Sequence, residues 1–261
     1  MNIRHYSVLA ALVGGLGLGL RFMQRKTGFE AETGLAVQGN IYALLLPILL
    51  ALFVLLLLVA IRRTPFSVIA AKRPFGELFD LEEKAAAKAV SVCGILAMMA
   101  AGALEVFEAV SITRDALSLA AGVFLVVAGG CLFLTVKALG AGEEGDGTYL
   151  LAAVCCAVVQ LVASYRMYAI DPVLQGYYVE LLALTAHVLA FYALAGFYFS
   201  GRGFGGFCFF TLIALVLTIT SLADRHALSE YLTYLGMSGA EVGLLVASHA
   251  NLFPRRGKRQ A

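Results

Sequence analysis

Charged side chains are scarce in this sequence. Only 14% of the 261 residues are Asp, Glu, Lys or Arg, whereas 61% are apolar and the mean hydropathy is +0.88. A soluble domain has about 25% charged and about 45–50% apolar residues. The net charge is only +2, and the sequence lacks the basic patch with interleaved aromatic residues that nucleic-acid binding requires. The composition therefore excludes an ordinary soluble domain and gives no support to a nucleic-acid partner.

Motifs for catalysis, nucleotides or metals are also missing. No two histidines stand four residues apart with a glutamate, which excludes a zincin motif. Gly236-Met-Ser-Gly239 has the spelling of the rhomboid protease nucleophile motif, but no later span supplies the histidine that this chemistry needs. The cysteines form no CxxC pair and lie in apolar runs, which is typical of small buried apolar residues: Cys93, Cys131, Cys155, Cys156 and Cys208. We expect no cofactor or metal, and we disfavour an enzyme.

Long apolar runs dominate the chain instead. A helix needs about 20 mainly apolar residues to cross the hydrocarbon core, and the runs lack the alternation of an outer-membrane barrel. Seven segments qualify: Tyr6–Phe22, Ile41–Ile61, Ala87–Leu104, Ala116–Val136, Tyr149–Tyr168, Tyr178–Phe199 and Phe204–Leu222. An eighth, Leu232–Leu252, is weaker because it contains Ser238, Glu241, Ser248 and His249. We predict an all-α, polytopic transmembrane helix bundle of about eight spans, forming one integral membrane domain over residues 1–261.

The distribution of cations predicts the orientation. Lys and Arg accumulate in the short cytoplasmic loops of membrane proteins. With eight spans, thirteen of the 19 Lys and Arg residues share the side of both termini, whereas seven spans would divide them nine against ten. The biased division favours eight spans with both termini cytoplasmic. Arg21, Arg25 and Lys26 oppose this orientation, because they follow the first span directly on the other side.

Two short segments carry packing signals. Gly15 and Gly19 form a GxxxG step in the first span, which favours the close approach of a neighbouring helix. Between the second and third spans, Glu77–Lys88 is rich in helix formers and pairs Asp80 with Lys84 at i, i+4. We predict a cytoplasmic helix here that lies on the membrane surface or runs straight into the third span. Its apolar side chains would rest on the membrane: Leu78, Phe79 and Leu81.

Three polar residues lie deep inside predicted spans. Counted from the starts of their spans, Gln160, His187 and Glu241 all reach roughly the bilayer centre at about 1.5 Å per residue. An ionisable group there costs several kcal/mol and usually faces protein or water. We predict that Glu241 turns inward and contacts a polar residue of another helix, with His187 or Gln160 favoured. These three form the candidate intramembrane polar site, and polar contact between helices is the alternative role.

A denser group of polar residues lies on the side opposite the termini. It suggests an outward-facing vestibule for a small polar solute, although helix caps and interfacial tyrosines would give a similar pattern. The candidate vestibule residues are Glu105, Glu108, Arg166, Asp171, Glu180 and Asp224.

Three classes of function remain open, and the least favoured of them is an enzyme that acts on a lipid-phase substrate. The first is a small-solute permease or transporter component that uses the central polar residues, in a bacterial plasma membrane. The second is a non-catalytic membrane sensor or assembly partner. In that case the basic loop Arg62–Lys88 or the tail Arg255–Arg259 would meet another protein or anionic lipid.

Overall fold

The chain folds into a bundle of long helices. The computed structural model describes residues 3–30, 33, 35–63, 70, 72–169, 173 and 176–253, and these contain no β-strand beyond a single bridge between Phe29 and Ala36. The helices are α1 (Ile3–Thr27), α2 (Ile41–Arg63), α4 (Phe75–Phe79), α5 (Ala85–Glu108) with a π-helical turn (Ala109–Thr113), α6 (Ala116–Leu139), α7 (Thr148–Tyr168), α8 (Tyr178–Ser200), α9 (Phe204–Ser221) and α10 (Leu228–Leu252). The predicted all-α class is confirmed.

Local chemistry explains several helix boundaries. The Asn40 side chain accepts hydrogen bonds from the backbone N–H groups of the first turn of α2, and Asp115 does the same for Ser118 in α6. At the start of α10, the Glu230 carboxylate reaches back to the N–H of Ala227 at 2.9 Å. Helix α8 ends at Gly201, whose φ of 65° is the left-handed conformation that glycine adopts without strain.

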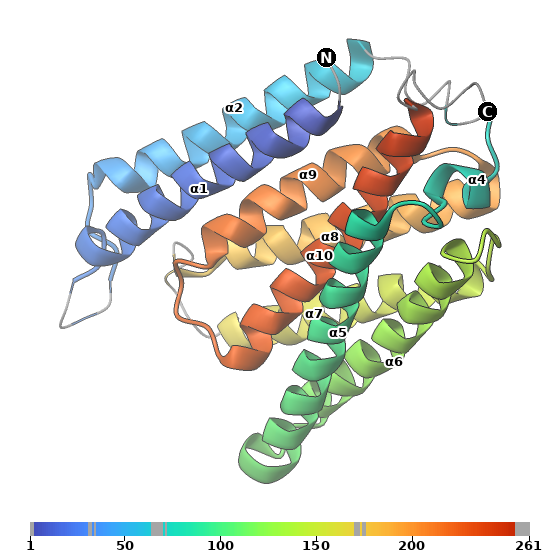
Figure 1. The fold of residues 1–261 in the computed structure, drawn as a ribbon. Coiled ribbons are helices and arrows are strands. Elements are labelled where there is room, and N and C mark those ends of the chain that lie inside the picture. The colour runs from blue at the N-terminus through green and yellow to red at the C-terminus, as the bar shows by residue number, and fades with distance from the viewer. Residues whose placement is uncertain are drawn as a thin grey trace.

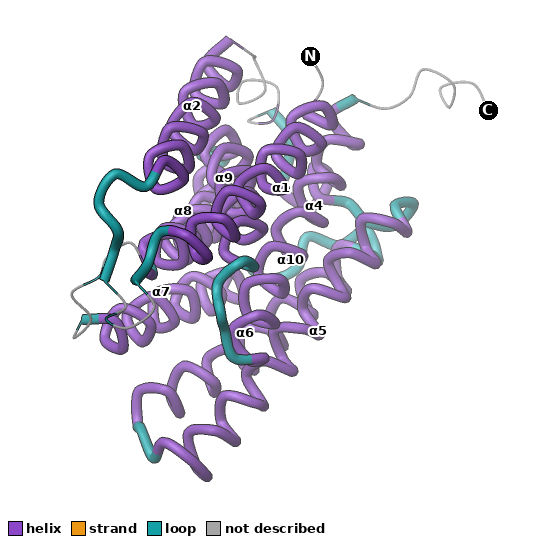
Figure 2. The backbone as a smooth tube through the Cα atoms, turned by 90° about the vertical axis from the view of Figure 1, so that its left-hand side faces the viewer, coloured by secondary structure: helices purple, strands orange, loops and turns teal. Residues whose placement is uncertain are grey.

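The long helices alternate in direction between two ends of the bundle. At the Arg21 end, helices α1, α5, α7 and α9 finish and α2, α6, α8 and α10 begin; the opposite end is named the Phe79 end. Helices α5, α6, α7, α8 and α9 pack one against the next in chain order, α10 packs chiefly along α5 and also touches α9 and α8, and α1 and α2 attach through α9 (Figure 1). The start of α1 and the end of α10 both lie at the Phe79 end (Figures 1 and 2).

Seven of the described helices are long and apolar enough to cross a membrane: α1, α2, α5, α6, α7, α8 and α9. The chain is therefore described as a multi-pass membrane protein. Helix α10 has 25 residues but is not among the seven, in keeping with its polar sequence. It nevertheless runs antiparallel to α5 along that helix's whole length. Ser229 bonds to Glu108 at one end, and Asn251 bonds to the backbone of Leu78 and Asp80, just before α5, at the other.

Glycines allow α5 and α10 to pack very closely. A Cβ at Gly94 would lie 2.5 Å from the backbone nitrogen of Ala240, and one at Gly239 would lie 2.9 Å from the Cα of Gly94. Gly236 and Gly243 likewise face α5 with no room for a side chain. The Gly236–Gly239 pair therefore serves helix contact, as small residues do in membrane bundles.

The packing predicted for Gly15 and Gly19 is wrong for the described part of the chain. A Cβ added at either position would meet nothing within 4 Å. The glycines of α1 that face a neighbour are Gly14, against Ile219, and Gly17, against Thr220 of α9. The GxxxG spelling located a helix rich in glycine but not the face that α9 covers.

The Glu77–Lys88 segment is not one helix. Helix α4 ends at Phe79, a turn follows, and α5 begins at Ala85, although the Asp80–Lys84 pair forms at 3.3 Å as predicted. Leu78, Phe79 and Leu81 do not rest on the membrane surface, because all three are fully buried. Helix α4 instead packs inward against the end of α10.

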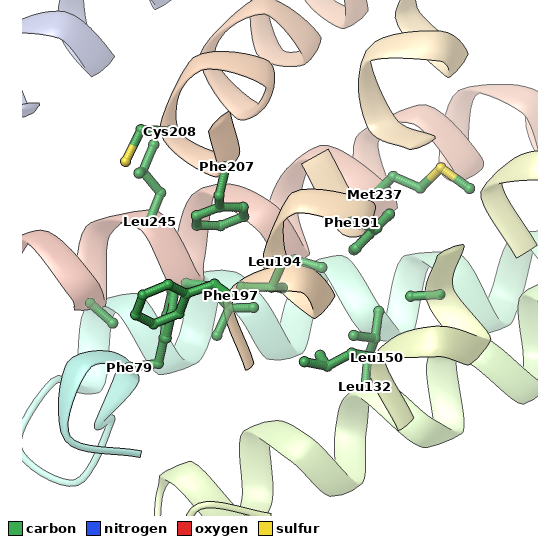
Figure 3. Packing of buried hydrophobic residues seen from close by; sticks show 14 of the residues in the cluster. Phe79, Leu132, Leu150, Phe191, Leu194, Phe197, Phe207, Cys208, Met237 and Leu245 are labelled. Atoms are coloured by element: carbon green, nitrogen blue, oxygen red, sulfur yellow. The ribbon is translucent and has the colours of Figure 1, made fainter. Parts of the chain in front are cut away.

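Aromatic side chains fill the Phe79 end. The Phe79 ring centroid lies 4.7 Å from that of Phe75, and 5.7 to 6.2 Å from those of Phe197, Phe204 and Phe207. Figure 3 shows Phe79, Phe197 and Phe207 converging there, with Leu132, Leu150, Phe191 and Met237 continuing the core. The cysteine prediction is only partly correct: Cys156 and Cys208 are buried, Cys131 is half-buried, and Cys93 and Cys155 lie on the outside of the bundle.

Candidate functional site: a buried polar seam between α8, α9 and α10

Two ionisable side chains meet in the middle of the bundle. Nδ1 of His187 on α8 lies 2.9 Å from Oε1 of Glu241 on α10, and both side chains are 0% exposed. The prediction that Glu241 turns inward to a polar residue of another helix is thus confirmed, with His187 as the partner. Burying two ionisable side chains so completely carries a large desolvation cost, which only close hydrogen bonding between them can offset.

Two hydroxyls extend this pair. Nε2 of His187 lies 3.1 Å from Oγ1 of Thr218 on α9, and Ser238 on α10 donates to the same Thr218 oxygen at 3.0 Å. With a neutral imidazole and an ionised carboxylate, Nδ1–H donates to Glu241 and Nε2 accepts from Thr218. With the proton on Glu241, the carboxyl donates to Nδ1 and Nε2–H donates to Thr218. The four residues are named the central cluster.

One oxygen of the central cluster has no hydrogen-bond partner among the described residues. Oε2 of Glu241 is buried, and nothing in the described part of the chain bonds to it. Buried polar atoms in folded proteins are nearly always paired, so an exception calls for an explanation. A carboxylate oxygen in this condition is a potential site for a proton or for a hydrogen-bond donor.

Gln160 does not join the central cluster. Its Nε2 donates instead to Oε2 of Glu105 on α5 at 2.9 Å, and the side chain is 6% exposed. The depth estimate therefore placed three residues at one level, but Gln160 faces another neighbour. Thr218, which sequence reasoning missed, completes the cluster.

A second polar layer lies one heptad nearer the Arg21 end. Glu180 precedes His187 by seven residues on α8, and Tyr234 precedes Glu241 by seven on α10, so the same faces meet again about 10 Å away. The buried Glu180 carboxylate accepts hydrogen bonds from Tyr234 and, at 2.7 Å, from Tyr168. This repeat at seven residues was the signal in the sequence that could have identified both layers.

His226, in the loop between α9 and α10, faces this second layer. Its Nε2–H donates to the carbonyl of Ser221 at 3.0 Å, while Nδ1 lies 3.3 Å from Glu230 and 3.7 Å from Glu180. Burial alone would lower the pKa of His226. The Glu230 carboxylate 3.3 Å from Nδ1 and the negative charges of Glu180 and Asp224 outweigh burial, so the pKa of His226 is raised. The imidazolium form is the one that suits this site.

Asp224 in the same loop holds a buried arginine. Nε of Arg21 lies 2.9 and 3.2 Å from the two Asp224 oxygens, and Nη1 and Nη2 donate to Gln24 and to the carbonyl of Gly176. Arg21 is 0% exposed and Asp224 6%. Nε of Arg25 lies 3.5 Å from the same carboxylate. Asp224 is therefore a buried counter-ion, and Arg21 ties α1 to two loops through Asp224 and Gly176.

A pocket of about 160 Å³ opens beside these layers, between α5, α7 and α10. Glu105, Glu108, Gln160, Glu230, Thr233 and Tyr234 are among its lining residues. Of the predicted vestibule residues, Glu105 and Glu108 thus line a pocket, and Glu180 and Asp224 are buried near it.

The other two vestibule candidates are not in this pocket. Arg166 is largely exposed and pairs with Asp115 at 3.1 Å, where the backbone hydrogen bond from Ser118 chiefly lowers the pKa of Asp115. Asp171 lies outside the described residues.

The basic segments proposed as partner sites are described only in part. Residues 64–69, 71 and the tail from 254 lie outside the description, so Arg255–Arg259 is not placed. Within the loop, Arg73 donates to the carbonyl of Asn251 at 2.9 Å and lies 3.4 Å from Glu77, while Lys84 pairs with Asp80. These cations are engaged within the chain.

Among the described residues, no group of three or more His, Cys, Asp and Glu side chains is arranged to hold a metal ion. No protein-family model, curated protein or solved structure matches this chain.

Proposed function

We propose that this chain is a proton-linked carrier of a small polar solute, or the membrane component of one, in a plasma membrane. The observation that carries the proposal is the enclosed pair of His187 and Glu241. Ionisable residues inside a membrane bundle are rare, and they mark proton relays and substrate paths. Serine and threonine hydroxyls would suffice as polar contacts between helices, and at a lower desolvation cost.

The central cluster suits reversible proton binding. The pair is neutral with one shared proton, whether that proton sits on the carboxyl or on the imidazole. Loss of it leaves a net negative charge beside two hydroxyls, and gain of a second leaves a net positive charge. Loss of the shared proton reverses the hydrogen bond between His187 and Thr218, because Nε2 then accepts from the hydroxyl to which Ser238 also donates. A titration here would therefore reorganise contacts among α8, α9 and α10.

The two ends of the bundle differ as carrier ends should in one state of alternating access. The Arg21 end has the carboxylate-lined pocket and the Glu180–Tyr234 layer above the central cluster. The Phe79 end is filled by buried aromatic rings around α4. Solute and protons would enter from the Arg21 end in this state.

The orientation follows from eight crossings, with both termini cytoplasmic. The length of α10 against α5 supports the eighth crossing. Arg21 and Arg25, which oppose the orientation by charge, share the single negative charge of Asp224, so one of their two positive charges is offset. A C-terminal green fluorescent protein should therefore fluoresce, and a C-terminal alkaline phosphatase should stay inactive; an active phosphatase would contradict the orientation.

The carrier role can be tested on solid-supported membranes. The reconstituted protein should give a transient current after a pH step and a larger current with a transported solute from a panel of amines, amino acids and sugars. Glu241→Gln should abolish the pH-step current, while Glu143→Gln in the exposed turn should retain it. A pH-step current unchanged in Glu241→Gln would refute proton binding at this pair.

One observation favours the alternative, a non-transporting sensor. The lining of the pocket reaches Tyr234 but does not include Ser238 or Glu241. A sensor would bind protons at the pair without moving solute. It would give the transient current, sensitive to Glu241→Gln, but no sustained solute-driven flux from any member of the panel.

A further inference from the structure

An apolar cleft separates α2 from α8 and α9. It has a volume of about 360 Å³, which is within the range of ligand pockets. Pro47 and Val54 of α2 form one wall, Tyr178 and Leu189 of α8 the other, and Phe210 lies on the α9 side. It is separate from the polar pocket and shares no residue with the central cluster.

The cleft has the length of one bilayer leaflet. Its α8 wall runs from Tyr178, the first residue of that helix, to Leu189, which is about 16 Å at 1.5 Å per residue. Half of a hydrocarbon core of about 30 Å is about 15 Å. The cleft thus extends from the Arg21 end of the bundle to about its middle.

Its polar groups are placed as an ester-linked chain requires. Within the cleft, the Thr185 hydroxyl is already bonded to the carbonyl of Leu181 at 2.7 Å, so this wall presents no free donor in mid-leaflet. At the Arg21 end, the Tyr178 hydroxyl is buried without a hydrogen-bond partner among the described residues. The Arg21 guanidinium lies 5.4 Å from the centroid of the same ring. The cleft therefore offers one hydrogen-bond donor that is unpaired among the described residues, the Tyr178 hydroxyl, at the membrane interface. The rest of its lining suits a hydrocarbon chain.

We propose that the cleft is a binding site for one acyl chain of a bilayer phospholipid, from the leaflet at the Arg21 end, with its ester group near Tyr178. The acyl chain would fill the space between α2 and the rest of the bundle, because α2 packs chiefly on α1 and touches α9 only lightly. This inference is independent of the proposed carrier function.

The experiment uses the absence of tryptophan from the chain. Phe210→Trp places a reporter in the cleft, Phe107→Trp places one on the outer surface, where Phe107 is 63% exposed, and Phe191→Trp places one in the core. In bilayers of phosphatidylcholine with brominated acyl chains, the first two reporters should be quenched and the third should not. After transfer to detergent with a few brominated lipids per protein, quenching should persist several-fold more strongly at 210 than at 107.

Blocking the cleft distinguishes a resident chain from passing lipid. Ala51→Phe, on the α2 wall, should remove the residual quenching of the 210 reporter, whereas Ala11→Phe on the exposed face of α1 should leave it. Tyr178→Phe should weaken it by removing the hydroxyl. Equal loss of quenching at 210 and 107 in detergent would overturn the proposal. So would residual quenching that survives Ala51→Phe, or shielding of the reporter that depends on protein concentration without lipid, which would identify a second copy of the chain.

Discussion

The imidazole of His187 and the carboxylate of Glu241 are held 2.9 Å apart with neither side chain exposed. They are 54 residues apart in sequence and belong to α8 and α10, two helices that both begin at the Arg21 end and run in the same direction. Each is the polar member of a face that recurs after seven residues, with Glu180 and Tyr234 in the preceding layer. The pair is therefore one of two polar layers between α8 and α10, and its loss should affect the stability of the protein as well as its activity.

Removing one member of the central pair should destabilise the protein strongly. Glu241→Leu leaves His187 buried without its carboxylate partner, and breaking a buried pair costs about 3–5 kcal/mol. The melting temperature, measured by circular dichroism, should fall far more for Glu241→Leu than for Glu143→Leu, because Glu143 is exposed. The double variant His187→Leu/Glu241→Leu should recover part of the loss. Equal melting temperatures for Glu241→Leu and Glu143→Leu would contradict the stabilising role of the His187–Glu241 pair.

Glycine substitutions should distinguish packed faces from open ones. Gly94→Ala places a Cβ 2.5 Å from the Ala240 nitrogen, so α5 and α10 must separate, at a cost of about 1–3 kcal/mol. Gly15→Ala meets nothing within 4 Å and should be neutral or slightly stabilising, because alanine is the better helix former. The melting temperatures of both variants in detergent measure this directly. Destabilisation by Gly15→Ala would indicate a neighbour on that face.

The buried ion pair of Arg21 with Asp224 should stabilise the folded protein far more than the exposed ion pair of Arg166 with Asp115. Asp224→Asn leaves Arg21 enclosed with an uncompensated charge, for which about 3–5 kcal/mol is expected. Asp115→Asn removes the partner of Arg166, which is 62% exposed, and the ion pair itself should contribute little because solvent screens it. To set aside the helix cap of Asp115, the comparison uses double-mutant cycles for both pairs. Similar coupling energies would show that burial does not strengthen the Arg21 pair.

The stability of the Arg21 end should depend on pH through His226. Its pKa is raised above the ordinary value of 6.5, so the folded state binds the proton more tightly than the unfolded state. The resulting stabilisation is complete below about pH 6.5 and is lost as pH rises through the folded-state pKa. Glu180, Glu230 and Asp224 are the charges that cause it.

The measurement is the difference in melting temperature between the wild type and His226→Gln across pH 5 to 9. The difference should shrink as pH rises, because glutamine carries no proton to lose. A constant difference, or one that grows with pH, would contradict the protonated state assigned to His226.

The helices, and the position of each polar residue along its helix, could be predicted from the amino-acid sequence. Apolar runs of about 20 residues require membrane-spanning helices, and a fixed rise per residue converts position into depth. Seven predicted spans correspond to apolar helices, and His187, Glu241 and Gln160 are buried inside the bundle, while their common depth in the bilayer stays a prediction. The division of charge predicts that Leu232–Leu252 also crosses the membrane, and this eighth crossing stays a prediction.

Which helix faces meet could not be predicted from the sequence and became known from the packing of the helices. Depth says nothing about rotation around a helix axis, so it could not tell that His187 faces Glu241 while Gln160 faces Glu105. It also could not select Gly14 and Gly17 over Gly15 and Gly19 as the glycines against α9. Arg21 and Asp224 are 203 residues apart, and only the docking of α1 on α9 brings the cation to its partner. Partner choice depends on which helices pack side by side, and apolar sequence leaves that choice open because lipid and protein interiors are equally apolar.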